Sequence, residues 1–272
     1  RLLFEPQMIR VPAGRFIMGS SSSEIEQAKQ GGFFRNWVSL DQPQHEVELS
    51  EYLISKYPIT NREYQAFIRE SAHTPPRGWD GDQYPSEKGD HPVVNVSWGD
   101  ATAYCRWLRG KTKKLYTLPT EAEWEKAARV PFPLRIGELQ MEEKVSLIWP
   151  WGDEPHEKNA NVLETGIGDT TPVGQFSPQG DSSFGCADMA GNVWEWCYDW
   201  YDENVYKNRE NGVQNPLGSE TGKNRVLRGG SFDFDIWYAR SDCRGRYPPN
   251  YLARNLGFRV AISLTKLESD SY

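Results

Sequence analysis

Turn-forming and aromatic residues constrain the fold of this chain more than any other feature of its sequence. Its 272 residues include 24 Gly, 18 Pro and 11 Trp. Gly and Pro interrupt regular structure and mark turns, whereas large aromatic side chains fill irregular cores. The composition therefore predicts many turns and few long helices, in a loop-rich α+β fold rather than a helical bundle or a doubly wound sheet.

The charge of the chain excludes several classes of protein. The formal net charge is −7, and 25% of the residues are charged. A mildly acidic chain is a poor general binder of nucleic acid, because phosphate binding needs a basic face. No apolar run approaches membrane-spanning length. We therefore expect a soluble protein with neither a nucleic-acid partner nor a membrane segment.

The cysteines predict free thiols and a reducing cytoplasm. They are far apart and form no CxxC pair, which argues against a disulfide scaffold and a zinc ribbon. The chain opens without a signal peptide, and its start at Arg1 indicates a trimmed sequence from which a native leader or an upstream domain could be missing. The four cysteines are Cys105, Cys186, Cys197 and Cys243.

Local patterns predict the main elements of the first half of the chain. Apolar and polar residues alternate around a Pro-Ala-Gly turn, which predicts a β-hairpin over Met8–Gly19. The polar run Ser20–Gly32 is interpreted as a loop. Capping residues predict three helices, which begin after Thr60, after Ser97 and after Thr120.

The domain organisation is predicted to be simple, with one unusual stretch. No linker or internal repeat divides the chain, so we expect one domain over residues 1–272, with an insertion over Val130–Leu147.

The stretch Arg225–Val260, the predicted ligand-binding segment, differs in composition from the rest of the chain. Between Ser231 and Leu256 aromatic residues, Asp and Arg crowd together, and Lys, Glu, Gln and Met are absent. We interpret this stretch as a binding surface presented by a rigid scaffold.

A series of motifs in a fixed order carries a family resemblance. Together they resemble the formylglycine-generating enzyme, or sulfatase-modifying factor, family from about Met8 to Ala261. The resemblance implies a variant of the C-type lectin fold, loop-rich, with a small twisted antiparallel sheet and two to three helices. The motifs are VPAGRFIMGS, PITNREYQAF, HPVVNVSWGDATAYCRWL, LPTEAEWEKAAR, PWGDE, TTPVG, DMAGNVWEW, RVLRGGSF and NLGFRV.

The same resemblance predicts that the best-known chemistry of the family is absent. Its oxidase members bind copper through two cysteines that follow the RGGS motif. Those positions fall at about Phe234 and Ala239 here. Neither residue can bind Cu(I), which prefers thiolate ligands, and Cys243 alone cannot supply the pair. We therefore expect no copper and no catalytic residues.

Calcium is the metal that the resemblance still implies. In the oxidases the segment that matches DMAGNVWEW wraps a Ca²⁺ ion, using the positions of the Asp188 and Glu195 side chains and the Gly191 and Val193 carbonyls. Oxygen ligands of this kind are those that Ca²⁺ prefers. The alternative is that both carboxylates bond to turn amides without a metal.

The unusual stretch also resembles the end of the variable proteins of diversity-generating retroelements. There, adenine-directed mutagenesis of Asn codons produces many residue types but not Lys, Glu, Gln, Met or Trp. The residues Ser231–Leu256 obey this restriction except at Trp237, which we expect to be an invariant core residue. The alternative is a tightly packed family segment that needs Arg, Asn and Gly for its turns.

The stretch has a composition suited to recognition of a varied protein or other macromolecular ligand. Tyr and Phe bring large contact areas at small entropic cost, and Arg and Asp make directional polar contacts. Trp237 is expected to belong to the scaffold. The residues expected on the exposed binding surface are Phe232, Asp233, Phe234, Asp235, Tyr238, Asp242, Arg244, Arg246, Tyr247, Asn250, Tyr251, Leu252 and Arg254.

Two other functions are open at this point. The first is an enzyme of the same superfamily that lacks the copper cysteines, as in siderophore maturation, with Asp233, Asp235 and Asp242 as acid–base groups. The second is a sensor domain of a larger kinase or NTPase, with neither diversification nor catalysis.

Overall fold

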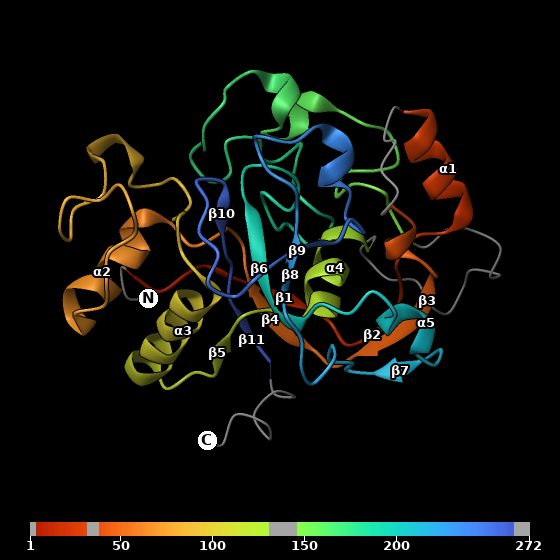
Figure 1. Ribbon diagram of the computed structural model, residues 1–272, viewed down its shortest axis with the longest axis horizontal. Helices are drawn as coiled ribbons and strands as arrows, with labels where there is room; N and C mark the ends of the chain where they lie inside the picture. The colour runs from red at the N-terminus through yellow and green to blue at the C-terminus, as the bar shows by residue number, and fades with distance from the viewer. Residues whose placement is uncertain (1–3, 32–37, 131–145, 264–272) are drawn as a thin grey trace.

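The computed structural model describes residues 4–31, 38–130 and 146–263 (Figure 1). Its α-helices are α1 (Ser22–Gln30), α2 (Asn61–Ser71), α3 (Trp98–Thr112), α4 (Glu121–Arg129) and α5 (Val205–Asn208). Its strands are β1 (Met8–Val11), β2 (Gly14–Met18), β3 (His45–Leu49), β4 (Tyr52–Ser55), β5 (Tyr116–Thr117), β6 (Trp194–Trp200), β7 (Val213–Gln214), β8 (Arg225–Arg228), β9 (Gly245–Tyr247), β10 (Leu256–Gly257) and β11 (Ala261–Ile262). Short 3₁₀ turns are η1 (Val38–Asp41), η2 (Ser86–Lys88), η3 (Glu157–Asn159), η4 (Leu163–Thr165) and η5 (Ile236–Ala239).

The strands form three small sheets, with the orders β1-β4-β11-β5, β10-β6-β8-β9 and β2-β3-β7. Most pairs are antiparallel, but β10 pairs with β6 and β3 pairs with β7 in parallel. The loop-rich α+β class is confirmed. The details differ from the expected single antiparallel sheet with two to three helices, because short strands from distant parts of the chain add to separate sheets.

The predicted hairpin over Met8–Gly19 is wrong, although both of its strands exist. Strand β1 pairs with β4, with Val11 opposite Tyr52, and β2 pairs with β3, with Phe16 opposite Val47. The Pro-Ala corner between β1 and β2 sends the chain from one sheet to the next rather than back along itself. Each of the two strands pairs instead with a strand from residues 45–55, which come later in the sequence.

The helices begin where side chains satisfy the free backbone N–H groups. Thr60, Ser97 and Thr120 each form a capping box, so the three predicted helix starts are confirmed. The loop predicted over Ser20–Gly32 is wrong, because Ser21 forms the same device with Glu24 and begins α1. Two apolar residues of α1 are also buried. The predicted insertion over Val130–Leu147 lies almost wholly outside the described residues.

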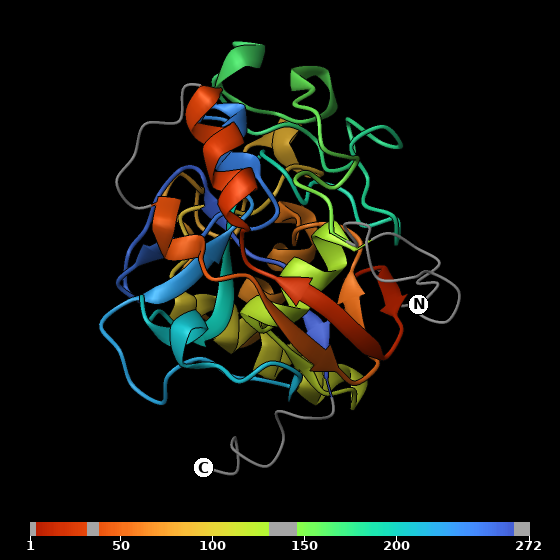
Figure 2. The same ribbon diagram turned by 90° about the vertical axis from the view of Figure 1, so that its right-hand side faces the viewer.

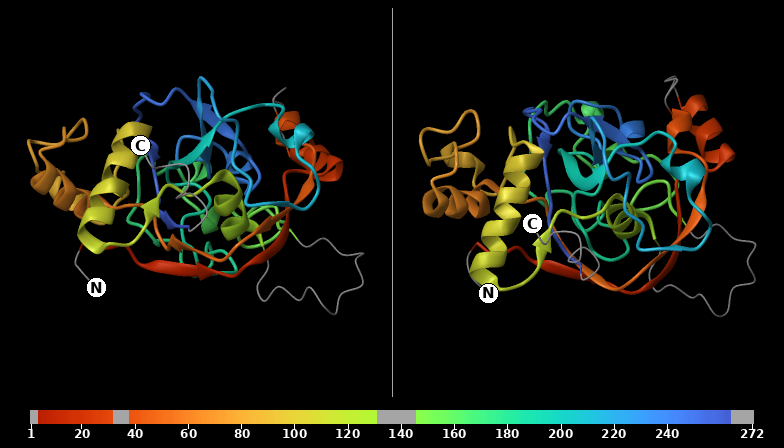
Figure 3. Two further views of the ribbon diagram at one scale, coloured as in Figure 1. Left: turned by 90° about the horizontal axis from the view of Figure 1, so that it is seen from below. Right: turned by 60° about the horizontal axis from the view of Figure 1, so that its bottom comes forward.

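The helices lie around the central sheet β10-β6-β8-β9. In Figure 1, α2 and α3 lie on one side of that sheet, and α1 lies on the other. Figure 2 shows α1 beside the η5 turn, where Gly31 packs so closely against Trp237 that a Cβ atom would overlap the indole ring. Seen from below, α3 runs alongside β5 (Figure 3). None of the helices within the described ranges is long and apolar enough to cross a membrane.

Buried ion pairs join α4 to the rest of the core. Every residue of α4 is buried, including its charged ones. From β8, Arg228 donates to Glu121 at 3.1 Å and to Glu125 at 2.7 Å. Arg129 donates to Glu125 at 3.1 Å and to Glu24 of α1 at 3.0 Å. These buried charges are each compensated by a partner, which is the condition under which burial is tolerated.

Glu121 is the shared acceptor of this network. It accepts from Arg228 and also from Arg244, whose Nε lies 2.7 Å from Glu121 Oε1. Burial alone would raise the pKa of Glu121, but the charges of Arg244 and Arg228 outweigh it and lower the pKa to about 2. The carboxylate is therefore ionised throughout the physiological range, and it contributes stability only while it stays ionised.

We expect Glu121→Gln to lower the free energy of unfolding by about 3 kcal/mol at pH 7, because it leaves the buried guanidinium group of Arg244 without its carboxylate partner and that of Arg228 with Glu125 alone. Since the folded-state pKa is lowered, the wild-type advantage is present above pH 4.5 and shrinks as the pH falls towards 2. Urea unfolding of both proteins across this range measures the difference. The control Glu51→Gln breaks an exposed pair with Arg10 and should change little. Equal effects of the two substitutions would contradict the network.

Candidate ligand-binding site

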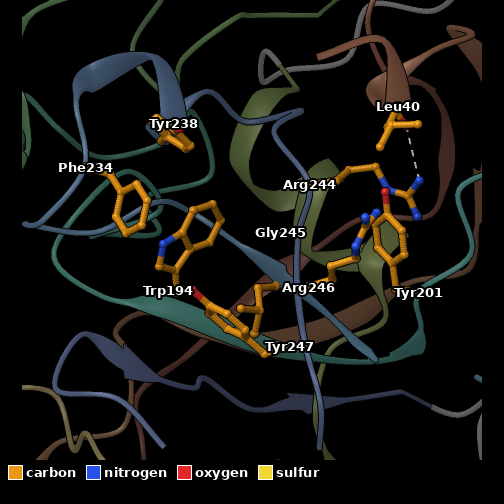
Figure 4. Close-up of a pocket in the computed structure, with 10 residues that line it drawn as sticks. Leu40, Trp194, Tyr201, Phe234, Tyr238, Arg244, Gly245, Arg246 and Tyr247 are labelled. Carbon is orange, nitrogen blue, oxygen red and sulfur yellow. Dashed lines mark hydrogen bonds between the residues drawn. The ribbon is translucent and has the colours of Figure 1, made fainter. Parts of the chain in front are cut away.

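A pocket of about 250 Å³ opens where the unusual stretch crosses the central sheet (Figure 4). Its walls come from the start of β6, from β8 and β9, and from the η1 and η5 turns. Seven of the ten lining residues belong to the stretch Arg225–Val260, which is predicted to bind ligands. The lining residues are Leu40, Trp194, Tyr201, Leu227, Phe234, Tyr238, Arg244, Gly245, Arg246 and Tyr247.

One wall of the pocket is aromatic. The rings of Trp194 and Phe234 meet edge to face, with their centroids 5.8 Å apart, and Phe234 lies 4.8 Å from the ring of Tyr238. Gly245 lets β9 pass close to this wall, because a Cβ atom there would lie 3.0 Å from the Trp194 ring and 3.1 Å from Leu227. Such edge-to-face clusters present apolar surface with fixed geometry.

The opposite wall carries two guanidinium groups that both pack against one aromatic ring. The side chains of Arg244 and Arg246 both lie 4.6 Å from the Tyr201 ring centroid. Figure 4 shows these three residues on one side of the pocket and the aromatic wall on the other. Cations over an aromatic face are attracted by the ring quadrupole, which holds both guanidinium groups in place.

The predicted binding residues divide into three groups. Phe234, Tyr238, Arg244, Arg246 and Tyr247 line the pocket. Exposed residues outside the pocket lining are Asn250, Tyr251, Leu252 and Arg254, and Asp233 and Asp235 are half-buried. The ring of Tyr251 stacks on Tyr247 with centroids 4.1 Å apart, which links the exposed group to the pocket.

The prediction of exposure is wrong for the third group, the buried residues. Asp242 accepts from Ser20 and from Arg240, and the ion pair with Arg240 lies in the core. Arg244 is buried by its bonds to Glu121, although one side of it reaches the pocket. The same reversal applies to Phe232 and Tyr238, which are 1% and 2% exposed. The chain turns here without a regular period, so several residues face inward where sequence reasoning placed them outward.

Two important pocket residues were missed because they lie outside the stretch. Trp194 is the first residue of β6, and Tyr201 follows the last. Trp194 belongs to the DMAGNVWEW motif, from which only calcium ligands were predicted. Leu40 and Leu227 also line the pocket and were not predicted. The dense aromatic run WEWCYDWY was the available signal. Only the folded structure shows which of its rings face the unusual stretch.

The positions that carry copper ligands in the oxidases hold no thiolate here. Phe234 presents its ring to the pocket, and Ala239 is fully buried beside Ile148 and Trp149. All four cysteines are buried and free, as predicted. Burial raises the pKa of the Cys243 thiol, which keeps it protonated. These side chains offer no ligand set for Cu(I).

The three carboxylates considered for acid–base chemistry are engaged elsewhere. Asp233 forms an ion pair with Arg254. Asp235 caps the η5 turn by accepting from the Trp237 N–H at 3.0 Å. Asp242 is inaccessible to a substrate because it is fully buried against Arg240. The geometry therefore provides no pair of carboxylates that faces the pocket together.

The residues implied for calcium lie in one turn before and within β6. Glu195 accepts from Arg259 at 2.6 Å and from the Trp124 indole at 2.7 Å, so the Arg259 charge already balances its own. Asp188 accepts one backbone bond, from the Gly174 N–H, and no ion pair reaches it among the described residues. Burial raises the pKa of Asp188 to about 6. Calcium stays a prediction that centres on Asp188, because among the described residues Glu195 has an ion-pair partner and the Asp188 carboxylate has none.

Comparison with known proteins identifies relatives over nearly the whole chain. Residues 3–264 match the family model of the sulfatase-modifying factor enzyme 1-like domain. The formylglycine-generating enzyme of Bos taurus is 30% identical over 312 residues, which cover 94% of this chain and 74% of the bovine protein.

Two solved structures superpose over the same extent. PvdO from Pseudomonas aeruginosa has a TM-score of 0.71 and 26% identity and covers 96% of both chains. Treponema denticola variable protein 1 has a TM-score of 0.69 and 23% identity and covers 94% of both chains. The similarity to the Treponema protein, whose name describes it as variable, shows that this chain shares its fold.

If Asp188 holds Ca²⁺, millimolar calcium should raise the melting temperature of the wild-type protein relative to EGTA, because the ion binds only the folded chain. Asp188→Asn should abolish this response while leaving the protein folded, since Asn tolerates the left-handed backbone at this position (φ 53°). Differential scanning calorimetry measures both. A wild-type protein that does not respond to calcium would favour the alternative, in which both carboxylates only stabilise the turn.

Proposed function

Because this chain belongs to the family of sulfatase-modifying factor enzyme 1-like domains, we propose that it uses the C-type lectin-like fold of that family to bind a ligand without catalysis. In this proposal, residues 225–260 form a ligand surface diversified by adenine-directed retroelement mutagenesis, and the ligands are varied proteins or other macromolecules. The observation that carries the proposal is the pocket, seven of whose ten lining residues come from this one segment.

The segment has a fixed side, whose residues bond to the core, and a presented side, whose residues face outward. A diversified surface requires both. Arg240, Asp242 and Arg244 bond to the core and hold the backbone. Arg246, Tyr247 and the exposed residues beyond them are presented outward. Substitutions on the presented side leave the core contacts intact. Such a division lets a surface change its specificity while the scaffold keeps its fold.

The proposed absence of catalysis is supported by the side chains at the two positions that bind copper in the oxidases. Phe234 and Ala239 replace a thiolate pair with apolar groups. An enzyme using other chemistry would need reactive groups facing the pocket. The ionisable side chains that line it are Tyr201, Tyr238, Arg244, Arg246 and Tyr247. This is a set suited to binding through rings and positive charge.

The decisive test of diversification is genetic. Sequencing the DNA that flanks the gene should reveal a reverse transcriptase and a template repeat of the codons for 225–260. We expect the two copies to differ only at template adenines, and at codons for presented residues such as Arg246 and Tyr247. Codons for the buried Arg228 should be identical in both copies, because its substitution would break the ion-pair network. A missing template, or differences at other bases, would overturn the proposal.

Presented positions should also tolerate substitution. We expect Leu252→Ala, at a residue 48% exposed, to change the free energy of unfolding by less than about 0.5 kcal/mol. Phe232→Ala, at a residue 1% exposed, should cost about 3–5 kcal/mol, because it leaves a cavity in the core. Urea unfolding of the two variants measures the contrast. A large loss of stability from Leu252→Ala would place this residue in the scaffold and remove it from the presented side.

A further inference from the structure

The pocket carries positive charge on a protein that is acidic overall. Its lining includes two arginines and no Asp or Glu, whereas the whole chain has a formal charge of −7. A local excess of positive charge in a partly apolar pocket favours a negatively charged guest, because charge interactions strengthen as water is excluded. The two arginines, however, differ in what they can offer a guest.

Arg244 is already committed to the scaffold. Its Nε and one terminal nitrogen donate to the two oxygens of Glu121, at 2.7 and 3.1 Å. The other terminal nitrogen donates to the carbonyls of Leu40 and Asp202, each at 3.3 Å. With its charge balanced and both terminal nitrogens bonded, Arg244 forms a fixed wall of the pocket and is not a recognition group.

Arg246 is held in position, but its charge is not balanced. It lies in β9 opposite Val226 of β8, so its backbone is fixed by the central sheet. Its guanidinium group packs against the Tyr201 ring at 4.6 Å. Its side chain is exposed, and no carboxylate pairs with it among the residues the structure describes. A positioned guanidinium group without an acidic partner is a ready site for a planar anion.

The aromatic rings facing Arg246 determine which chemical group of the ligand can lie next to its anionic group. Trp194, Phe234 and Tyr247 present ring surface to the pocket, and a volume of about 250 Å³ accommodates one large side chain. A carboxylate matches the fork of a single guanidinium group, whereas a phosphate dianion would be only half neutralised. We infer that the pocket binds a carboxylate presented beside an aromatic or large apolar side chain of a protein ligand, with Arg246 as the recognition group. This inference rests on the proposed function.

Small probes test the inference without knowledge of the natural ligand. In NMR titrations of the full chain, 3-phenylpropionate should bind and its neutral amide should bind at least about tenfold more weakly, the contribution expected of a charge-assisted hydrogen bond. Arg246→Gln should weaken 3-phenylpropionate by a similar factor and remove the preference over the amide. The matched control is Arg62→Gln, which removes a charge from an exposed residue of α2 that lies outside this pocket and outside the predicted binding surface.

Thermal melts should show that both variants are as stable as the wild type, since both side chains are exposed. Equal binding of acid and amide, unchanged binding in Arg246→Gln, or tighter binding of benzylphosphonate would each overturn the inference. Tyr201→Leu should weaken the acid but not the amide, because it removes the ring that positions Arg246. Equal loss of both would assign Tyr201 a structural role only and contradict the positioning step.

Peptides distinguish the two sources of a carboxylate on a protein. Gly-Gly-Phe with a free carboxyl terminus presents the terminal group, and acetyl-Glu-Phe-amide presents a side chain. Binding of either supports a protein ligand and names the source, and binding of neither overturns it. The outcome is separable from the genetic test. If the protein prefers carboxylates but its gene has no template repeat, only the proposal of diversification is overturned. If a template repeat is found but the protein does not prefer carboxylates, only this inference is overturned.

Discussion

The buried network of guanidinium and carboxylate groups is the interaction on which the rest of the structure depends. Glu121 and Glu125 of α4 hold Arg228 of β8, and Glu121 also holds Arg244. Arg129 extends the network from α4 to α1. Desolvation makes each of these charges costly on its own. The fold therefore requires all the partners at once, and α4, the central sheet and the ligand segment are fixed relative to one another.

This arrangement explains how a chain with short helices and two-residue strands can hold a precise pocket. Long sheets and bundles fix side chains through many regular contacts, which this chain does not have. Here Arg244 is anchored by Glu121, and the next residues in sequence, Gly245 and Arg246, are carried into the pocket as part of β9. The buried half of the segment thus sets the geometry, and the presented half is available for recognition. A surface built in this way can change its residues without changing its framework.

Sequence reasoning succeeded where the determining contacts are local. The capping boxes at Thr60, Ser97 and Thr120 involve residues three apart, and all three predicted helices are present. The same pattern at Ser21 was overlooked because the surrounding residues are polar. The hairpin prediction failed for the opposite reason. The partners of β1 and β2 lie beyond position 44, and alternation within a strand does not specify which distant strand it joins.

The sequence by itself determined the family, the loop-rich α+β class, the free cysteines and the segment that lines most of the pocket. The ordered motifs and the unusual residue usage of Ser231–Leu256 carry that information directly. The tertiary structure alone decided which residues of the segment face inward, as Asp242 does, and which scaffold rings, Trp194 and Tyr201, complete the site. The physical reason is that an irregular segment has no period from which its inward face can be read. Its orientation is set instead by buried charges, whose partners lie many residues away in the sequence.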